Sequence, residues 1–192
     1  MKTRILITAL IVHVGSFLAQ AGETYKFDQA HSRITFTVHQ YLGTTHGKFT
    51  KFEGKIEVDR EHPEKSSVVA RIQVNSIDTG IVNRDNHLKS EELFNAPKFP
   101  EISFKSRSVR RTGPESGDIL GDLTMHGVTR PVTLQVKLLT PSKETKQTRW
   151  SVTTDPLKRS DFNLEFSQTS ETVSGIGQSV AVEIEIEAMR AE

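Results

Sequence analysis

The chain contains no cysteine among its 192 residues, so no disulfide can stabilise it. Its stability must therefore come from a hydrophobic core. The first 21 residues leave about 171 for the remainder of the chain, which is enough for one domain with a full core. No repeat, low-complexity tract or change of composition marks a second domain, so we expect one domain over residues 22–192.

The chain also lacks an excess of charge of either sign. The formal net charge is +1, and it becomes −1 if residues 1–21, which carry Lys2 and Arg4 and no acid, are removed. A nucleic-acid-binding protein usually presents a basic face, and the richest basic stretch, residues 107–111, precedes Gly113 and Pro114 and is typical of a solvated turn. Nucleic acid is therefore not an expected partner.

Long apolar runs are absent except at the N-terminus. Lys2 and Arg4 precede a mainly apolar stretch, residues 5–18, and Ala19 and Ala21 fit the small-x-small rule for signal cleavage. The stretch of about 14 residues is shorter than the roughly 20 needed to span a bilayer, which favours cleavage over an uncleaved anchor. We predict a signal peptide over residues 1–21, a periplasmic or secreted location, and no transmembrane segment in the mature protein.

A two-residue alternation of apolar and polar side chains dominates the rest of the chain. In residues 180–187, valine and isoleucine occupy every second position and three glutamates occupy positions between them, as expected for a half-buried strand. The same alternation predicts strands at residues 34–38, 52–58, 68–74, 119–125 and 132–138. Shorter strands are predicted at residues 24–28, 101–107, 148–155 and 158–166.

This pattern predicts a mainly β, antiparallel fold in which about eight strands form a barrel. Closure of the barrel is favoured because it removes exposed sheet edges. Phe49 and Phe52 cannot share a face of a regular strand, and a bulge near Thr50 and Lys51 would allow both to face inward.

One segment, residues 83–94, lacks both the alternation and β-branched side chains, and we predict a short helix there. Asn83 or Asp85 could cap its start, and the stretch before Pro97 would end it. Its few apolar residues, Leu88 among them, are enough to cover one end of a barrel.

Four motifs, in order along the chain, resemble those of the YceI-like family. They are Asp28-Gln-Ala-His-Ser32 with Ile34-Thr-Phe36; Asn83-Arg-Asp85-Asn-His-Leu88 with Leu93-Phe94 and Lys98-Phe-Pro100; Gly121-Asp-Leu-Thr-Met-His-Gly127-Val-Thr-Arg-Pro131; and Arg159-Ser-Asp-Phe162 with the alternating last strand. Asn163 departs from the pattern, since many relatives carry glycine there. The resemblance covers residues 25–188.

The resemblance implies an exported, lipocalin-like barrel that binds polyisoprenoids or similar long-chain amphiphiles and forms a homodimer. No cofactor is implied other than the bound isoprenoid or lipid itself. The interior of an eight-stranded barrel is either filled by side chains or holds one slender ligand. Small residues at the inward positions Gly54, Ala70 and Gly121 favour space inside.

The residues expected to line an apolar cavity are inward-facing on strands or belong to the helical segment. They are Ile34, Phe36, Val38, Ile72, Val74, Leu88, Phe94, Phe104, Leu123, Leu134, Val136, Trp150, Phe162, Val182 and Ile184. For a polar head group at the mouth, the expected contacts are Arg84, Asn86 and His87, with hydrogen bonds from Trp150 or Tyr41.

The sequence offers little for catalysis or metal binding. His87 with Asp85, or His31 with Ser32 and Asp28, could form acid, base and nucleophile pairs, but there is no Gly-x-Ser-x-Gly motif. The six histidines after residue 21 show no His-x-x-x-His spacing. We therefore expect neither a catalytic residue nor a metal site.

The predicted function is that of an exported, non-enzymatic carrier. The ligand would be a polyisoprenoid, an isoprenoid quinone or a fatty-acid-like amphiphile. Two alternatives remain, namely a secreted structural or stress-response interaction module with a solid core, and a lipid-directed hydrolase.

Overall fold

A computed structural model describes residues 22–140, 146–166 and 175–191 of the chain. The predicted signal peptide, residues 1–21, lies outside the described residues. Within them, no helix has both the length and the apolar character needed to cross a bilayer.

The described residues form one antiparallel sheet of twelve strands, one short α-helix and four 3₁₀ turns. The strands are β1 (Glu23–Phe27), β2 (Arg33–Gln40), β3 (Gly43–Phe49), β4 (Phe52–Val58), β5 (Ser67–Gln73), β6 (Ile77–Asp78), β7 (Glu101–Arg111), β8 (Ser116–Met125), β9 (Val128–Leu138), β10 (Gln147–Thr154), β11 (Leu157–Lys158) and β12 (Ser179–Arg190). The helical elements are η1 (Gln29–His31), η2 (Pro63–Lys65), η3 (Val74–Ser76), α1 (Val82–Lys89) and η4 (Arg159–Phe162).

Eight of the strands close into a barrel in the order β1-β4-β5-β7-β8-β9-β10-β12. Closure is made by β12, which pairs with β10 along one edge and with β1 along the other, where Tyr25 lies opposite Arg190. The predicted closed, antiparallel, eight-stranded barrel with one short helix is thus confirmed.

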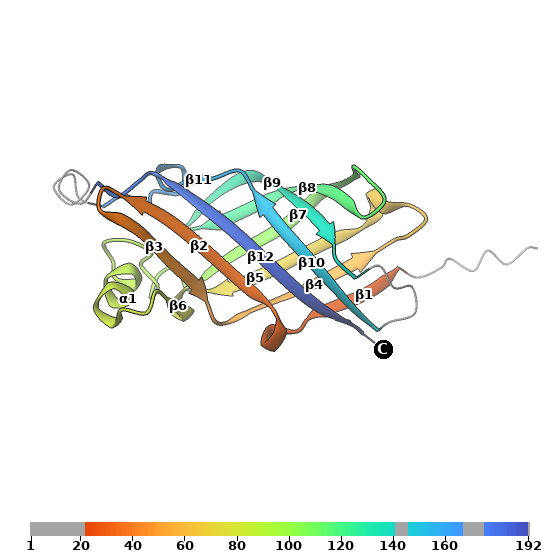
Figure 1. Ribbon diagram of the computed structural model, residues 1–192, viewed down its shortest axis with the longest axis horizontal. Helices are drawn as coiled ribbons and strands as arrows, with labels where there is room; N and C mark the ends of the chain where they lie inside the picture. The colour runs from red at the N-terminus through yellow and green to blue at the C-terminus, as the bar shows by residue number, and fades with distance from the viewer. Residues whose placement is uncertain (1–21, 141–145, 167–174, 192) are drawn as a thin grey trace, which may run out of the picture.

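Three further strands, β2, β3 and β6, extend the sheet at one end of the barrel. β2 follows β1 along the same edge of β12, with Val182 opposite Phe36 and Ile184 opposite Ile34. β3 lies beside β2, and the two-residue β6 lies beside β3. Figure 1 shows β2, β3, β6 and α1 together at this end, which we call the α1 end.

The chain turns from β1 into β2 at a corner formed by Asp28, η1 and Ser32. The Ser32 hydroxyl donates to the Asp28 carbonyl oxygen at 2.6 Å and accepts from the backbone N–H of Glu187 at 2.9 Å. The Asp28 N–H donates to the Glu187 carbonyl oxygen at 2.8 Å. One buried hydroxyl therefore joins the corner to β12, the strand that closes the barrel.

Phe49 and Phe52 are both buried, but the predicted bulge is replaced by a two-residue break between two separate strands, β3 and β4, and only Phe49 lines the cavity. The Thr50 N–H donates to the Ser76 carbonyl oxygen, and the Lys51 carbonyl accepts from the Gln73 N–H. These two hydrogen bonds tie the break to the segment around η3 and replace ladder bonds that the chain loses between the strands. β3 itself was not predicted, because its sequence has almost no apolar alternation.

The helix prediction was right in place and too long in extent. α1 ends at Lys89 and turns follow, with the Asn95 N–H donating to the Ser90 carbonyl oxygen at 2.8 Å. The cap prediction was wrong, since Ile81 occupies the N-cap position with no side-chain cap. Asp85 instead accepts hydrogen bonds from the N–H and hydroxyl of Thr79, at 2.9 and 2.6 Å.

The strand predicted at residues 158–166 was also wrong. After the two-residue β11 the chain enters η4, which ends at Asn163 in the left-handed conformation, φ 55°. Asparagine tolerates this conformation better than other non-glycine residues, which explains why the turn accepts it in place of glycine.

Candidate ligand-binding cavity

The barrel encloses a cavity of about 980 Å³ that runs along its length. This volume lies at the upper end of the range for small-molecule sites, roughly 300–1,000 Å³. The wall is built mainly from aliphatic and aromatic side chains of the barrel strands and of β2. Charged lining residues belong to the segments at the two ends, so the middle of the cavity is apolar.

The alternation of the strands explains why this wall is apolar. On β12, Val180, Val182, Ile184 and Ile186 line the cavity, whereas the intervening Glu183 does not. Neighbouring strands are in register with them, so that Val152 of β10 lies opposite Ile184 on one side and Val136 of β9 on the other. The inward side chains of β9, β10 and β12 therefore lie side by side in the cavity wall.

Three glycines of the wall accommodate aromatic rings rather than empty space. A Cβ atom added at Gly54 would lie 2.2 Å from the ring of Phe27, and one at Gly47 would lie 2.2 Å from the ring of Phe36. Gly121 lies under the ring of Phe104 in the same way. The expectation that Gly54 and Gly121 leave room for ligand was wrong in this detail, because the rings that line the cavity cover them.

The structure brings most of the predicted cavity residues together. Thirteen of the fifteen line the cavity, namely Ile34, Phe36, Val38, Ile72, Leu88, Phe94, Phe104, Leu123, Leu134, Val136, Trp150, Val182 and Ile184. Contact between these side chains and a ligand stays a prediction.

Val74 and Phe162 are buried but are not among the cavity-lining residues. Their placement in the cavity by strand alternation was wrong, since β5 ends at Gln73 and Val74 begins the turn η3. Phe162 lies in η4 rather than on a strand. Alternation assigns a face only while the backbone stays extended.

Several lining residues were missed, among them Phe27, Phe49, Val109, Leu157 and Phe166. Phe27 and Val109 lie on strands whose alternation could have placed them. Leu157 and Phe166 lie in or next to short and irregular segments, where the sequence carries no periodic signal.

At the α1 end, Arg84 and His87 line the cavity and Asn86 does not. Arg84 is held in place by Nε and Nη2, which donate to the hydroxyl and carbonyl oxygens of Thr79 at 2.8 and 2.9 Å. Its Nη1 lies 3.4 Å from the Thr45 hydroxyl on β3. His87 lies 2.9 Å from Glu92, and its ring meets that of Phe166 edge-on. Asn86 is exposed, so its predicted role at the head group lacks structural support.

Polar side chains also line the opposite end of the cavity, including Arg60, Arg111 and Ser116. The Arg60 guanidinium donates to Glu23 at 2.9 Å, and this hydrogen bond lowers the pKa of the Glu23 carboxyl. Burial raises the pKa of the Tyr25 hydroxyl, which donates to the same carboxylate at 2.7 Å. The cavity therefore has a polar rim at each end.

Of the two side chains predicted to hydrogen-bond a ligand head group, Trp150 already has a partner in the protein and Tyr41 does not reach the cavity. The Trp150 indole N–H donates to the Thr148 hydroxyl at 3.0 Å. Tyr41 is 79% exposed and does not line the cavity. Arg84 and His87 share the polar lining of the α1 end with Gln40, Thr45 and Arg159, and the Arg159 guanidinium lies over the same Phe166 ring that His87 contacts.

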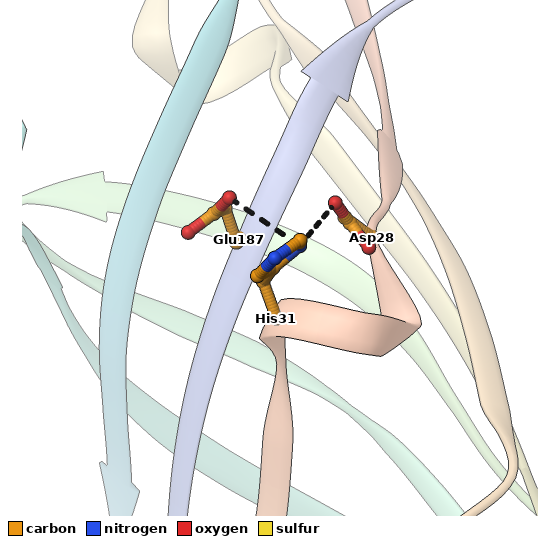
Figure 2. A group of neighbouring side chains, drawn as sticks. All are labelled: Asp28, His31 and Glu187. Atoms are coloured by element: carbon orange, nitrogen blue, oxygen red, sulfur yellow. Dashed lines mark hydrogen bonds and ion pairs between the residues drawn. The ribbon is translucent and has the colours of Figure 1, made fainter.

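Asp28, His31 and Glu187 form a cluster on the outer side of the corner (Figure 2), with ligand-type atoms all within 4.8 Å of one another. His31 Nδ1 lies 2.8 Å from Asp28 Oδ2 and 3.9 Å from Glu187 Oε1. The hydrogen bond to Asp28 raises the pKa of His31, and the same bond lowers the pKa of Asp28. Glu187 also accepts a hydrogen bond from Gln147. Internal partners thus account for the cluster.

Of the side-chain pairs considered for catalysis, His31 with Asp28 forms, whereas His31 with Ser32 and His87 with Asp85 do not form within the described residues. Ser32 Oγ bonds to the backbone of Asp28 and Glu187, while His31 bonds to the Asp28 carboxylate. Asp85 bonds to Thr79 rather than to His87. Neither histidine thus has a hydroxyl nucleophile hydrogen-bonded to its ring.

A sequence model of the YceI-like domain matches residues 25–188. A UPF0312 protein of Enterobacter sp. (strain 638) is 40% identical over 147 residues, 72% of this chain and 73% of the relative. Protein YceI of Salmonella arizonae is 41% identical over 137 residues, 69% of each chain.

Two solved structures share the fold. Burkholderia cenocepacia BcnA aligns with a TM-score of 0.76 at 22% identity, over 85% of this chain and 99% of that one. A polyisoprenoid-binding domain from Saccharophagus degradans, implicated in plant cell wall breakdown, aligns with a TM-score of 0.65 at 19% identity, over 87% of this chain and 98% of that domain.

Proposed function

The chain belongs to the YceI-like family, and on that premise we propose that it is an exported carrier that holds one long-chain apolar molecule inside its barrel. The observation that carries the proposal is the elongated cavity of about 980 Å³ with an apolar middle. Each methylene group buried there contributes roughly 0.8 kcal/mol, so a long chain gains more than a compact ligand.

The proposed ligand is a polyisoprenoid, an isoprenoid quinone or a fatty-acid-like amphiphile. Its apolar tail would lie among Phe36, Leu134, Val182 and their neighbours, and its polar head would lie near Arg84 and His87 at the α1 end. The Saccharophagus degradans neighbour binds polyisoprenoid, which makes this the first class to test.

The two alternative functions fit the structure less well. A module with a solid core does not account for a cavity of this size. A hydrolase would need a nucleophile beside its base, and the Ser32 hydroxyl is bonded to backbone groups instead. We also propose that residues 1–21 direct export and that the mature chain forms a homodimer. Sedimentation of the mature chain would test the homodimer.

Mass spectrometry of an organic extract tests the carrier directly. Protein purified from its own host should release a stoichiometric long-chain lipid. Delipidated protein should take up a prenyl or acyl probe and change the fluorescence of Trp150, the single tryptophan, which lines the cavity. No lipid in the extract together with no uptake of either probe would overturn the proposal.

Neighbouring positions of β12 provide a matched pair of variants. Val182→Gln places an amide in the apolar wall and should weaken probe binding by about tenfold or more, because burial of an unpaired amide costs roughly 1–3 kcal/mol. Glu183→Gln changes the adjacent residue, which does not line the cavity, and should leave binding unchanged.

A further inference from the structure

The most exposed large apolar side chains of the described residues gather at the α1 end. Tyr41 and Leu42, between β2 and β3, are 79% and 102% exposed, and Ile81 and Val82, at the start of α1, are 52% and 73% exposed. We call these four residues the apolar tip. The other exposed large apolar residues, Val69, Leu120, Leu139 and Met189, are only 39–43% exposed.

The apolar tip borders the mouth of the cavity at the α1 end. Gln40 and Thr45, which flank the turn with Tyr41 and Leu42, line the cavity, as does Arg84, two residues after Val82. The Arg84 guanidinium lies 3.4 Å from the Thr45 hydroxyl and so joins the two segments, and β3 also pairs with β6, the strand that precedes α1. Figure 1 shows the β2–β3 turn and α1 at the same end of the barrel.

The two segments that carry the apolar tip contain no carboxylate. Residues 39–46 and 79–84 include one arginine, two histidines and no aspartate or glutamate. Asp78, the nearest acid on one side, accepts from the Gly80 N–H at 2.9 Å and lies 3.5 Å from Lys48 Nζ. Asp85, on the other side, is buried and bonded to Thr79. Both neighbouring carboxylates are thus engaged within the protein.

This combination matches the chemistry of a phospholipid surface. Apolar side chains inserted at the boundary of head groups and acyl chains gain free energy in proportion to their buried area, and a nearby cation adds attraction to anionic lipids. An aromatic residue with a hydroxyl, such as Tyr41, suits the same boundary, where one end of the ring is wet. A carboxylate at the mouth would oppose this contact. Both segments of the apolar tip lack one, and the Glu92 carboxylate, which lies beside the mouth, is paired with His87 at 2.9 Å.

We propose that the apolar tip inserts into the surface of a phospholipid membrane and places the α1-end mouth against the bilayer. A long-chain ligand then passes between the bilayer and the cavity without exposing its tail to water. The inference rests on the proposed carrier function, because a ligand of that class resides in membranes and is almost insoluble outside them.

Flotation with vesicles of phosphatidylethanolamine and phosphatidylglycerol tests the proposal. The delipidated mature chain should float with the vesicles, and the double variant Leu42→Ser/Val82→Ser should partition at least about tenfold less, since it removes several inserted carbon atoms. The matched control is Val69→Ser/Leu120→Ser, which replaces apolar residues exposed on the barrel strands β5 and β8. It should float like the parent chain.

Transfer kinetics give a second measurement that separates docking from binding. Uptake of a pyrene-labelled fatty acid from the vesicles should slow about tenfold in the tip variant, while its affinity for the same probe added in solution stays unchanged.

Failure of the parent chain to bind the probe in solution would overturn the carrier function. Binding in solution without flotation, or equal flotation of both double variants, would overturn the docking proposal alone. Loss of self-association in the tip variant, without any flotation of the parent, would assign the surface to a second copy and also overturn it.

Discussion

Gly54→Ala tests whether the barrel is hollow where Phe27 covers the wall. The three nearest atoms to an added Cβ all belong to the Phe27 ring, at 2.2, 2.4 and 2.6 Å. Carbon atoms pack best at about 3.5–4.0 Å, so the ring must move by roughly 1.3 Å or more. Phe27 lines the cavity, so the ring can move into open space.

The expected cost to folding is small, and the expected cost to binding is larger. A ring displaced from its preferred rotamer costs about 0.5–1.5 kcal/mol, whereas overpacking a solid core costs about 1–3 kcal/mol or more. A ring that takes the place of one or two methylene groups of the ligand should weaken binding about fourfold to fifteenfold.

Urea unfolding and titration of Trp150 fluorescence with a long-chain probe measure the two effects. The double variant Gly54→Ala/Phe27→Leu serves as the control, because the smaller side chain removes the clash and should restore most of the affinity. A loss of more than about 3 kcal/mol in the free energy of unfolding, with unchanged affinity, would show that the space beside Phe27 is filled and would refute the reasoning.

Three further predictions concern the corner and the head group. Ser32→Ala should lower the free energy of unfolding by about 0.5–1.5 kcal/mol in urea titrations, because it removes the acceptor of the partly buried Glu187 N–H. His31 has a pKa raised above its ordinary value of 6.5 by Asp28, so its stabilising effect is complete below pH 6.5 and is lost as the pH rises through the raised pKa. The difference in urea midpoint between the parent chain and His31→Gln should therefore shrink as the pH increases above 6.5. Arg84→Gln should weaken binding of a long-chain carboxylate about tenfold or more, and that of the matching alcohol less, whereas Arg111→Gln at the opposite end should change neither.

Each of these three has a result that contradicts it. Unchanged stability of Ser32→Ala would mean that the corner does not depend on that hydroxyl. A midpoint difference for His31→Gln that grows with pH has the wrong sign for a raised pKa. A larger effect of the Arg111 variant than of the Arg84 variant would place the head group at the opposite rim.

The barrel itself could be predicted because its signal is local and repeated. In β12 the alternation of Val182 and Ile184 with Glu183 and Glu185 assigns each side chain to a face, and a half-buried sheet requires that assignment. The same alternation placed Leu134 and Val136 of β9 in the cavity wall. A period of two residues is visible in the sequence wherever the backbone stays extended.

The remaining features depend on contacts between segments far apart in the chain, which alternation does not report. The role of Ser32 depends on the backbone of Glu187, and the cover over Gly54 depends on a ring from the strand beside it. Asp85 looked like a helix cap from its position, yet its partner Thr79 precedes the helix. Val74 continues the apolar–polar alternation of β5 in the sequence, although the strand itself has ended at Gln73.

The two ends of the barrel resist widening differently. Along most of its length, each strand is hydrogen-bonded to two neighbours, so a larger bore requires breaking ladder bonds. The Val74 N–H donates to the Pro100 carbonyl oxygen, and past this bond, toward the α1 end, β6 pairs with one strand only, β3. The segment of residues 79–100 lies beside β6. That segment meets its surroundings through side chains, including Phe94 against Phe49 and Phe99 against His126. Side chains can change rotamer without loss of backbone hydrogen bonds. We therefore expect the α1 end to widen for bulkier ligands, while the diameter of the rest of the barrel stays fixed.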